Sequence, residues 1–350
     1  MKKNLRKIGM FALAITVMSA CKKDEVVDPC GDELTNGYFV TNEGNFGTGN
    51  GSISYVKYGE VRNNVFECRN ELLLGDVVQS MTIIDDNAYI MVNGSSKIEV
   101  ASVDFMYSVA TIQGSVSPRY MAKVSDSKAY VTDWGINGVQ VIDLLTNKIS
   151  STIACGAGPE GIAITNDFAY VCNLGGFGLD NTVSVIDIET DIVVSTLEVG
   201  DRPNSAVVDV NGAVWVLTEG YTEYDTDWNV VSETAGNLVK IVNNAIEATY
   251  VFEVGNHPED LVINDAGSTL YYSDGSWSKA VYAFAIADNE LPTTALINKS
   301  FYGLGCANGY IYGTDAVDFT QSGWSYKYTA DGTIIDSVQV GIIPGGYCFN

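Results

Sequence analysis

Polar side chains recur where apolar, strand-like runs end, and these residues are the first candidates for chemistry. Seven of them occupy similar positions along the chain: Asn42, Asn93, Asp133, Asn173, Glu219, Asp274 and Asp315. Their carboxylates and amides accept hydrogen bonds, and the amides also donate them. Asn and Asp at strand ends commonly bond to nearby backbone, so each residue also has a purely structural interpretation. If all seven lay at one level of a ring, they would together suit a ligand rich in amides.

Aromatic residues follow these strand ends in the adjoining loops. They are Phe46, Trp134, Phe177, Tyr221, Trp228, Trp277 and Phe319, with Tyr120 and Tyr302 in nearby connections. An isolated loop aromatic usually packs on its neighbour, but several on one face form a patch that marks an interaction site. Aromatic rings with polar neighbours suit a large, flat, partly apolar ligand. Trp215 lies inside a strand-like run and is expected in the core.

Histidine, the side chain that most often acts as a general acid or base, is scarce. His257 is the one histidine of the chain, which nearly excludes His-dependent triads and multi-histidine metal sites. We therefore expect a binding protein and no enzyme. An alternative stays open, because Glu160, Glu259 and Asp260 could hold the metal of a lactonase or lyase.

One segment partly matches a calcium loop. Asp225, Asp227 and Asn229 have the spacing with which such loops open, but Val230 replaces the expected glycine and Gly236 the closing acid. A solvated acidic loop is the preferred interpretation. We expect no required metal or other cofactor, with calcium as the weaker alternative.

The composition indicates a turn-rich β protein and excludes one large class of partner. The 350 residues include 35 glycines and 20 tyrosines but only 7 prolines. There are 43 acidic against 19 basic residues, a net charge of −24. Because contacts to the phosphate backbone need clustered Lys and Arg, we expect no nucleic-acid partner.

One unit of short strands recurs along the chain. Residues 128–163 and 168–207 both contain Ala-Tyr-Val, a loop, Val-x-Val-Ile-Asp, a β-branched strand, and Gly followed by Pro. The unit predicts inner strands starting near Gln79, Pro118, Pro159, Pro203, Pro258, Tyr302 and Pro344. Seven units of about 40 to 55 residues indicate a seven-bladed β-propeller with four antiparallel strands per blade. Residues 344–349 should pair with residues 37–42 and close the ring.

These repeats resemble a known class of propeller. Ala-Tyr-Val-Thr-Asp133 and Ala-Tyr-Val-Cys-Asn173, with their downstream motifs, are similar to YVTN-repeat and YncE-like proteins. This resemblance implies a fold and says little about function. A seven-bladed propeller behind an N-terminal surface-export signal, described below, also resembles BtuG-type proteins. That resemblance implies capture of cobalamin or another corrinoid outside the cell and transfer to an outer-membrane transporter, and no binding residue is carried over from it.

The N-terminal residues predict an export signal and a lipid anchor. Four basic residues precede an apolar stretch at 8–17, and small residues precede Cys21. We expect a signal peptide at 1–20, a lipid on Cys21, a flexible linker at 21–36 and the propeller at 37–350. The sequence Lys-Asp-Glu at 23–25 resembles a surface-export signal, which implies an outer-membrane lipoprotein facing the exterior. The acidic mature chain would contact the membrane through the lipid alone.

Cysteine pairing stays open at this level. An exported protein permits disulfides, but six cysteines besides Cys21 allow 15 pairings. They are Cys30, Cys68, Cys155, Cys172, Cys306 and Cys348.

The most concrete functional hypothesis is corrinoid capture by the aromatic loop face. A surface-layer or adhesion propeller that binds glycan or protein remains the main alternative.

Overall fold

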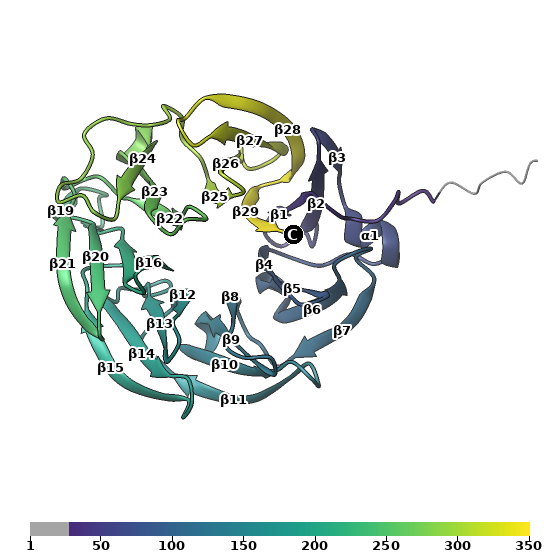
Figure 1. Ribbon diagram of the computed structural model, residues 1–350, viewed down its shortest axis with the longest axis horizontal. Helices are drawn as coiled ribbons and strands as arrows, with labels where there is room; N and C mark the ends of the chain where they lie inside the picture. The colour runs from purple at the N-terminus through teal and green to yellow at the C-terminus, as the bar shows by residue number, and fades with distance from the viewer. Residues whose placement is uncertain (1–27) are drawn as a thin grey trace, which may run out of the picture.

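The computed structural model describes residues 28–350, which form seven β-sheets arranged as a ring (Figure 1). We number these sheets as blades one to seven in chain order. The ring confirms the expected all-β, seven-bladed propeller. The predicted signal sequence, the predicted lipidation site Cys21 and residues 22–27 lie outside the described residues.

The first three blades each contain four antiparallel strands, which run in order from the channel outward. Blade one comprises β29 (Pro344–Phe349), β1 (Tyr38–Asn42), β2 (Ser52–Lys57) and β3 (Glu60–Arg62). Blade two comprises β4 (Val78–Ile84), β5 (Asn87–Val92), β6 (Lys97–Ser102) and β7 (Ser108–Gln113). Blade three comprises β8 (Pro118–Lys123), β9 (Lys128–Asp133), β10 (Gly138–Asp143) and β11 (Lys148–Ala154).

The remaining blades keep this order with two departures. Blade four comprises β12 (Pro159–Ile164), β13 (Phe168–Asn173), β14 (Thr182–Asp187) and β15 (Ile192–Glu198). Blade five comprises β16 (Pro203–Val208), β17 (Val214–Thr218), β20 (Asn237–Val242) and β21 (Ala245–Val251), and carries a separate hairpin of β18 (Tyr221–Tyr224) and β19 (Val230–Thr234). Blade six has three strands, β22 (Glu259–Ile263), β23 (Thr269–Asp274) and β24 (Ala280–Ala285). Blade seven comprises β25 (Gly303–Ala307), β26 (Tyr310–Asp315), β27 (Ser322–Thr329) and β28 (Ile334–Ile342).

Helices are few and short in the described part of the chain. They are α1 (Val65–Asn70) and the 3-10 turns η1 (Asn93–Ser95), η2 (Trp134–Ile136) and η3 (Ser276–Ser278). None of the helices within residues 28–350 is long and apolar enough to cross a membrane.

The core lies between the blades. Middle strands such as β9 and β13 are buried on both faces, because each blade packs against two neighbours. The outermost strand β15 instead alternates between exposed and half-buried residues, as expected where one face meets water. One core cluster joins Tyr89 and Ile98 of blade two to Met121 and Val131 of blade three. This burial is the main stabilising contribution, and it fixes the inner strands around the channel.

The C-terminal strand closes the ring as expected. β29 pairs antiparallel with β1, with Tyr38 opposite Phe349 and Phe39 opposite Cys348. In Figure 1 the yellow C-terminal strand lies beside the purple N-terminal strands at the channel. Blade one is thus built from both ends of the described chain.

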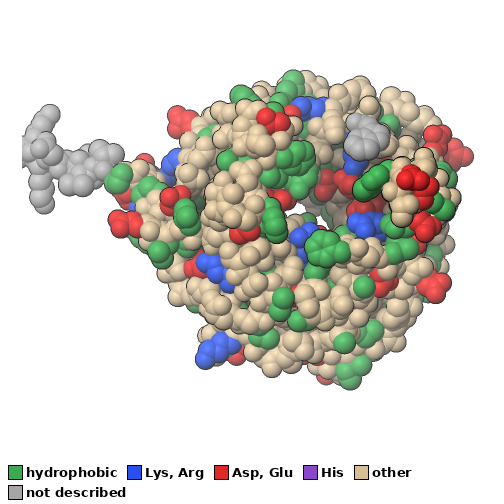
Figure 2. Space-filling model, turned by 180° about the vertical axis from the view of Figure 1, so that it is seen from behind, with side chains coloured by type: hydrophobic (Ala, Val, Ile, Leu, Met, Phe, Trp, Pro, Cys, Tyr) green, Lys and Arg blue, Asp and Glu red, His purple; other side chains and the backbone are tan. Residues whose placement is uncertain are grey.

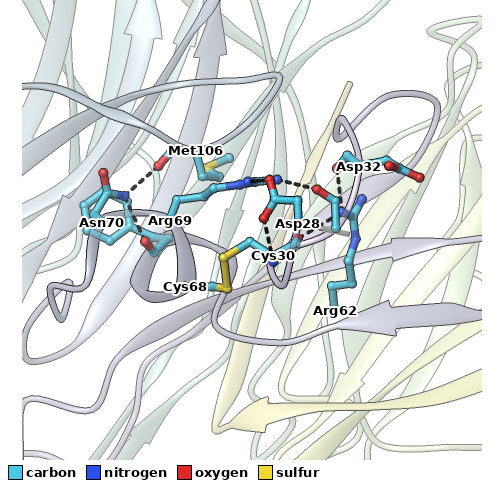
Figure 3. Close-up of a disulfide and its surroundings, with 10 residues drawn as sticks. Asp28, Cys30, Asp32, Arg62, Cys68, Arg69, Asn70 and Met106 are labelled. Atoms are coloured by element: carbon cyan, nitrogen blue, oxygen red, sulfur yellow. Dashed lines mark hydrogen bonds and ion pairs between the residues drawn. A yellow bond between two sulfur atoms is a disulfide. The ribbon is translucent and has the colours of Figure 1, made fainter. Parts of the chain in front are cut away.

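The described part of the predicted linker is fastened to blades one and two. Cys30 and Cys68 form a disulfide across 38 residues, joining residues 28–36 to α1 (Figure 3). The Arg69 guanidinium pairs with Asp28, and Leu34 is buried. Cys155, Cys172, Cys306 and Cys348 remain free thiols. The structure therefore assigns one of the pairings that the sequence left open.

Candidate ligand-binding site

A cavity of about 780 Å³ lies at one end of the central channel, which we call the channel mouth. Its wall combines residues at the beginnings of inner strands with the loops that follow the second strands, including those carrying Phe46 and Phe177. Figure 2 looks onto one face of the ring and shows a central hollow with acidic, basic and hydrophobic side chains on its rim. The cavity falls within the size range of small-molecule sites.

A paired arginine dominates one side of the cavity. Arg119 of β8 donates from Nε and Nη2 to the two carboxylate oxygens of Glu160 in β12, each at 2.8 Å. Its Nη1 donates to Oε1 of Gln79 in β4 at 2.5 Å. The two-point geometry fixes both charged groups, because guanidinium and carboxylate match as planar forks. These three neighbouring blades therefore present a rigid polar wall.

The arginine also supports an aromatic corner. The guanidinium carbon of Arg119 lies 4.1 Å from the Trp134 ring centroid, and Phe177 meets Trp134 edge-on with centroids 5.7 Å apart. Phe177 is fully exposed to solvent. The indole Nε1 of Trp134 is buried and has no hydrogen-bond partner within residues 28–350. A buried donor of this kind is costly unless an acceptor satisfies it.

Carboxylates gather on the blades further round the ring. Glu43 accepts a hydrogen bond from the Tyr302 hydroxyl at 3.0 Å, and Glu219 pairs with Arg202 at 2.9 Å. Glu259 pairs with Lys279 at 2.5 Å. Burial raises the pKa of both Glu43 and Glu219 above the usual range. The cavity thus has more acidic than basic groups on its wall.

Asp260 is the most perturbed of these acids. Burial, reinforced by the charges of Glu259 and Glu219 and opposed by Lys279, raises its pKa from 3.8 to about 8. Its Oδ2 is buried and unpartnered within residues 28–350. At neutral pH this carboxyl group is therefore largely protonated and can donate a hydrogen bond.

The strand-end residues do not form the expected ring around the channel. Asn93 and Glu219 line the cavity. Asn42, Asp133 and Asn173 are fully buried inside their blades. Asn42 donates to Ser52 and Ser54, and Asn173 to Thr182 and Ser184.

The other strand-end residues also bond locally. Asp133 accepts backbone N–H groups of residues 116, 117 and 135. Asp274 accepts from Asn256, and Asp315 from Lys299. Five of the seven side chains therefore hold loops and blades together, in line with their structural interpretation. Their part in ligand binding stays a prediction.

The aromatic candidates fall into two groups. Phe46, Trp134 and Phe177 line the cavity together with Tyr120 and Tyr302. Phe319 packs edge-on against Tyr302, with centroids 5.3 Å apart, and so supports the rim.

The second aromatic group belongs to blades five and six. Tyr221 and Trp228 are carried by the β18–β19 hairpin, where Trp228 is 81% exposed. Trp277 lies in η3. Tyr221 and Trp228 do not line the cavity in the described structure. Trp215 is fully buried and donates to Asp209 at 2.9 Å, which confirms its core position.

Sequence reasoning missed Arg119, Gln79, Glu43 and Asn204 as cavity residues. A usable signal was present in the repeat itself. The residue after the recurrent proline of the inner strand lines the cavity in five blades: Arg119, Glu160, Asn204, Glu259 and Gly345. This position faces the channel because side chains alternate along a strand.

The partial calcium motif forms the tip of the hairpin. The Asp225 carboxylate accepts the backbone N–H groups of Asp227 and Asn229 at 2.8 and 2.9 Å, a local turn arrangement. Within residues 28–350, no group of three or more His, Cys, Asp or Glu side chains is placed to hold a metal ion.

Fold and site together define a β-propeller with a ligand-sized, predominantly acidic cavity at its channel mouth. The chain belongs to the family described as a domain of unknown function (DUF5074), which matches residues 36–337. Among curated protein sequences none matches this chain.

Several solved structures share the fold at low sequence identity. A quinonprotein alcohol dehydrogenase-like protein from Bacteroides thetaiotaomicron is 14% identical, with a TM-score of 0.67 over 91% of this chain and 79% of that one. The periplasmic gluconolactonase PpgL of Pseudomonas aeruginosa is 10% identical, with a TM-score of 0.63 over 89% and 98%. A functionally unknown protein from Desulfotomaculum acetoxidans is 17% identical, with a TM-score of 0.63 over 89% and 98%. At these identities the likeness concerns the fold alone.

Proposed function

We propose that this chain captures a bulky small molecule at the channel mouth, with cobalamin or another corrinoid as the ligand class, and passes it to an outer-membrane transporter. The observation that carries the proposal is the corner formed by Arg119, Trp134 and Phe177. It combines an exposed aromatic surface with a buried indole N–H that lacks a partner within residues 28–350. A flat ligand with peripheral hydrogen-bonding groups would satisfy both features.

The charge of the cavity favours a ligand that donates hydrogen bonds. Glu43, Glu160, Glu219 and Glu259 offer carboxylate oxygens, whereas Arg119 is the one Lys or Arg among the described lining residues. The side-chain amides of a corrinoid would donate to these oxygens. Arg119, Arg202 and Lys279 are already paired with Glu160, Glu219 and Glu259, so a phosphorylated or otherwise anionic substrate would compete with these carboxylates for each cation. The rigid Arg119–Glu160 pair would limit the entropy lost on association.

The proposal includes a location at the cell surface. Residues 1–20 would direct export, Cys21 would carry the lipid, and residues 23–25 would send the protein to the cell exterior. Capture outside the cell would then require a transporter partner in the same membrane. No catalytic group and no cofactor take part in this function.

A second candidate rests on Asp260. A carboxyl group with a pKa of about 8 inside a cavity is suited to general acid catalysis. The candidate activity is hydrolysis of a sugar lactone. It predicts turnover of gluconolactone that is lost in Asp260→Asn.

Calorimetric titration of cyanocobalamin tests the first proposal. We expect one-to-one binding to the chain beginning at Lys22, and at least tenfold weaker binding after Trp134→Ala with Phe177→Ala. Tenfold corresponds to about 1.4 kcal/mol, within the range of one aromatic contact. Tyr58→Ala serves as the control, because Tyr58 is 88% exposed in the β2–β3 turn and does not line this cavity.

Two outcomes would contradict the proposal. Absence of both heat and a shift in melting temperature would exclude cobalamin and favour a glycan or protein ligand. Binding that survives the double substitution would exclude the Trp134 corner as the site.

A further inference from the structure

A second pocket lies at the opposite end of the strands from the channel mouth. It has a volume of about 490 Å³ and lies between blade seven and blade one, where the ring closes. We call it the seam pocket and define it by Tyr38, Tyr58, Tyr310, Lys327, Asp336 and Phe349. Tyr38 begins β1 and Phe349 ends β29, so both lie at the strand ends remote from the Phe46 loop. The two pockets share no lining residue in the described structure.

Lys327 is the central chemical group of the seam pocket. Its Nζ lies 3.8 Å from the Tyr310 ring centroid and 5.7 Å from that of Tyr312. In the described part of the chain, this ammonium takes part in no ion pair within 4.0 Å and donates no hydrogen bond. Burial lowers its pKa, although the nearby Asp336 opposes the shift. A half-buried cation held only by ring faces retains capacity for an anionic partner.

The walls around Lys327 are aromatic and already packed. Tyr312 lies with its ring centroid 4.9 Å from Phe349 and 5.0 Å from Tyr38. The Tyr38 hydroxyl lies 3.3 Å from Ser325 Oγ, which in turn lies 3.0 Å from the Tyr347 hydroxyl. The outer edge is formed by Tyr58, which is 88% exposed. The pocket therefore has an available aromatic surface next to ordered hydroxyl groups.

The charge of this pocket contrasts with that of the whole chain. Among the described side chains that line the pocket, Lys57 and Lys327 face a single acidic one, Asp336, whereas the whole chain carries a net charge of −24. Asp336 is exposed, and its Oδ1 accepts the N–H of Ser337. A local excess of positive charge in an acidic protein selects for an anionic ligand.

We propose that the seam pocket binds a carboxylate-bearing sugar, such as a terminal uronic acid of a glycan. The Lys327 ammonium would pair with the sugar carboxylate, and Tyr58 would pack against the pyranose ring. Asp336 and the Tyr38 hydroxyl, which Ser325 holds in place, would meet the hydroxyls of the sugar ring. The proposal is independent of corrinoid capture, because it uses different residues at the other end of the strands.

The test is titration of the mature chain with D-glucuronate, observed by ligand NMR, with D-glucose and benzoate as comparison ligands. We expect glucuronate to bind at least tenfold more tightly than either. Glucose lacks the carboxylate, and benzoate lacks the hydroxyls. Lys327→Met should weaken glucuronate binding at least tenfold, and Lys327→Arg should restore most of it.

The matched control is Trp134→Ala with Phe177→Ala, which should leave glucuronate binding unchanged. Circular dichroism of each variant would establish that the ring remains folded, and Tyr58→Ala offers a second route if Lys327→Met does not fold. Equal binding of glucose would overturn the role of Lys327, and equal binding of benzoate would overturn the sugar assignment. Absence of glucuronate binding, or binding unaffected by Lys327→Met, would overturn the site.

Discussion

At the scale of single residues, Asp260 links the cavity to the stability of the ring. The unfolded carboxyl ionises near its ordinary pKa of 3.8, but the folded one ionises near 8. Between these values the folded chain holds more protons than the unfolded chain. The stabilising contribution of protonated Asp260 is therefore complete below about pH 4 and is lost as the pH rises through 8.

We expect Asp260→Asn to flatten this dependence. In the unmodified chain, this one group should lower the free energy of unfolding by up to about 1.4 kcal/mol per pH unit between pH 5 and 8. The variant should lack that contribution, because an amide does not ionise. Urea unfolding at pH 5, 6.5 and 8 measures the difference.

Asp227→Asn provides the control for this experiment. Asp227 lies at the exposed tip of the hairpin, so its substitution should leave the slope unchanged. Identical slopes for the unmodified chain and Asp260→Asn would contradict a raised pKa at Asp260.

At the scale of elements, the repeat predicted the strands better than it predicted their side chains. The expected inner-strand starts at Pro118, Pro159, Pro203 and Pro344 coincide with the first residues of β8, β12, β16 and β29. The alternation of apolar residues and the glycine-rich turns were sufficient for this, because both are local properties. Closure by the last strand followed from the half-blades at the two ends.

The orientation of polar side chains depends on contacts between blades, which a local pattern does not contain. Asn42 and Asn173 end their strands as expected, yet neighbouring strands enclose them and their amides bond within the blade. Sequence reasoning misses Arg119 because the repeat marks the position after the proline but does not say which partner that side chain meets across the blades. Its importance comes from Glu160, which is distant in sequence and adjacent in the ring.

Blade six shows a further limit of the repeat. The repeat predicts a four-stranded unit, but the described structure has β22, β23 and β24 and a single bridge between Val281 and Ile297 in place of a fourth strand. The segment after β24 contains Pro292, whose ring cannot donate a ladder hydrogen bond. Residues 286–302 therefore follow β24 without forming a regular outer strand.

The β18–β19 hairpin contacts the propeller through His257. Nδ1 of the His257 imidazole lies 3.1 Å from the Glu219 carbonyl oxygen. It must donate this hydrogen bond, since a carbonyl oxygen only accepts. Nε2 lies 3.1 Å from Thr222 Oγ1 on β18. The two strands of the hairpin pair only with each other. Besides the chain connections and the hydrogen bond from Thr234 to Asp201, His257 thus gives the hairpin a side-chain contact with blade five.

We expect His257→Ala to loosen the hairpin without unfolding the ring. Proteolytic cleavage within residues 221–234 should become several times faster, while the free energy of unfolding should change by less than about 1 kcal/mol. Limited proteolysis followed by mass spectrometry measures the cleavage. Val231→Ala, an exposed position on the same hairpin, should cleave at the original rate. Unchanged cleavage in His257→Ala would show that other contacts hold the hairpin.

At the scale of the whole molecule, two connections join the beginning of the described chain to the rest. The Cys30–Cys68 disulfide fastens residues 28–36, and β29 supplies the inner strand of blade one. In a propeller the inner strand of each blade covers the edge of the next strand and packs against the inner strands of the neighbouring blades. Opening blade one would expose the edge of β1 and remove a packing partner from its neighbours, β4 of blade two and β25 of blade seven.

We therefore expect deletion of residues 344–350 to destabilise the entire propeller and not blade one alone. The deletion removes β29, and with it the ladder to Tyr38–Asn42 and the contact between Phe349 and Tyr312, whose ring centroids lie 4.9 Å apart. Loss of a fully buried aromatic ring typically costs about 3–5 kcal/mol. Phe349 is half-buried, but the deletion also removes Tyr347, the buried Cys348 and the β29–β1 ladder, so the total loss should reach at least that range. The urea midpoint should fall in a single cooperative step. Removal of the exposed Asn350 alone, which ends one hydrogen bond to Leu34, should shift it little. A urea midpoint unchanged by the full deletion would mean that the propeller is stable without β29 closing blade one.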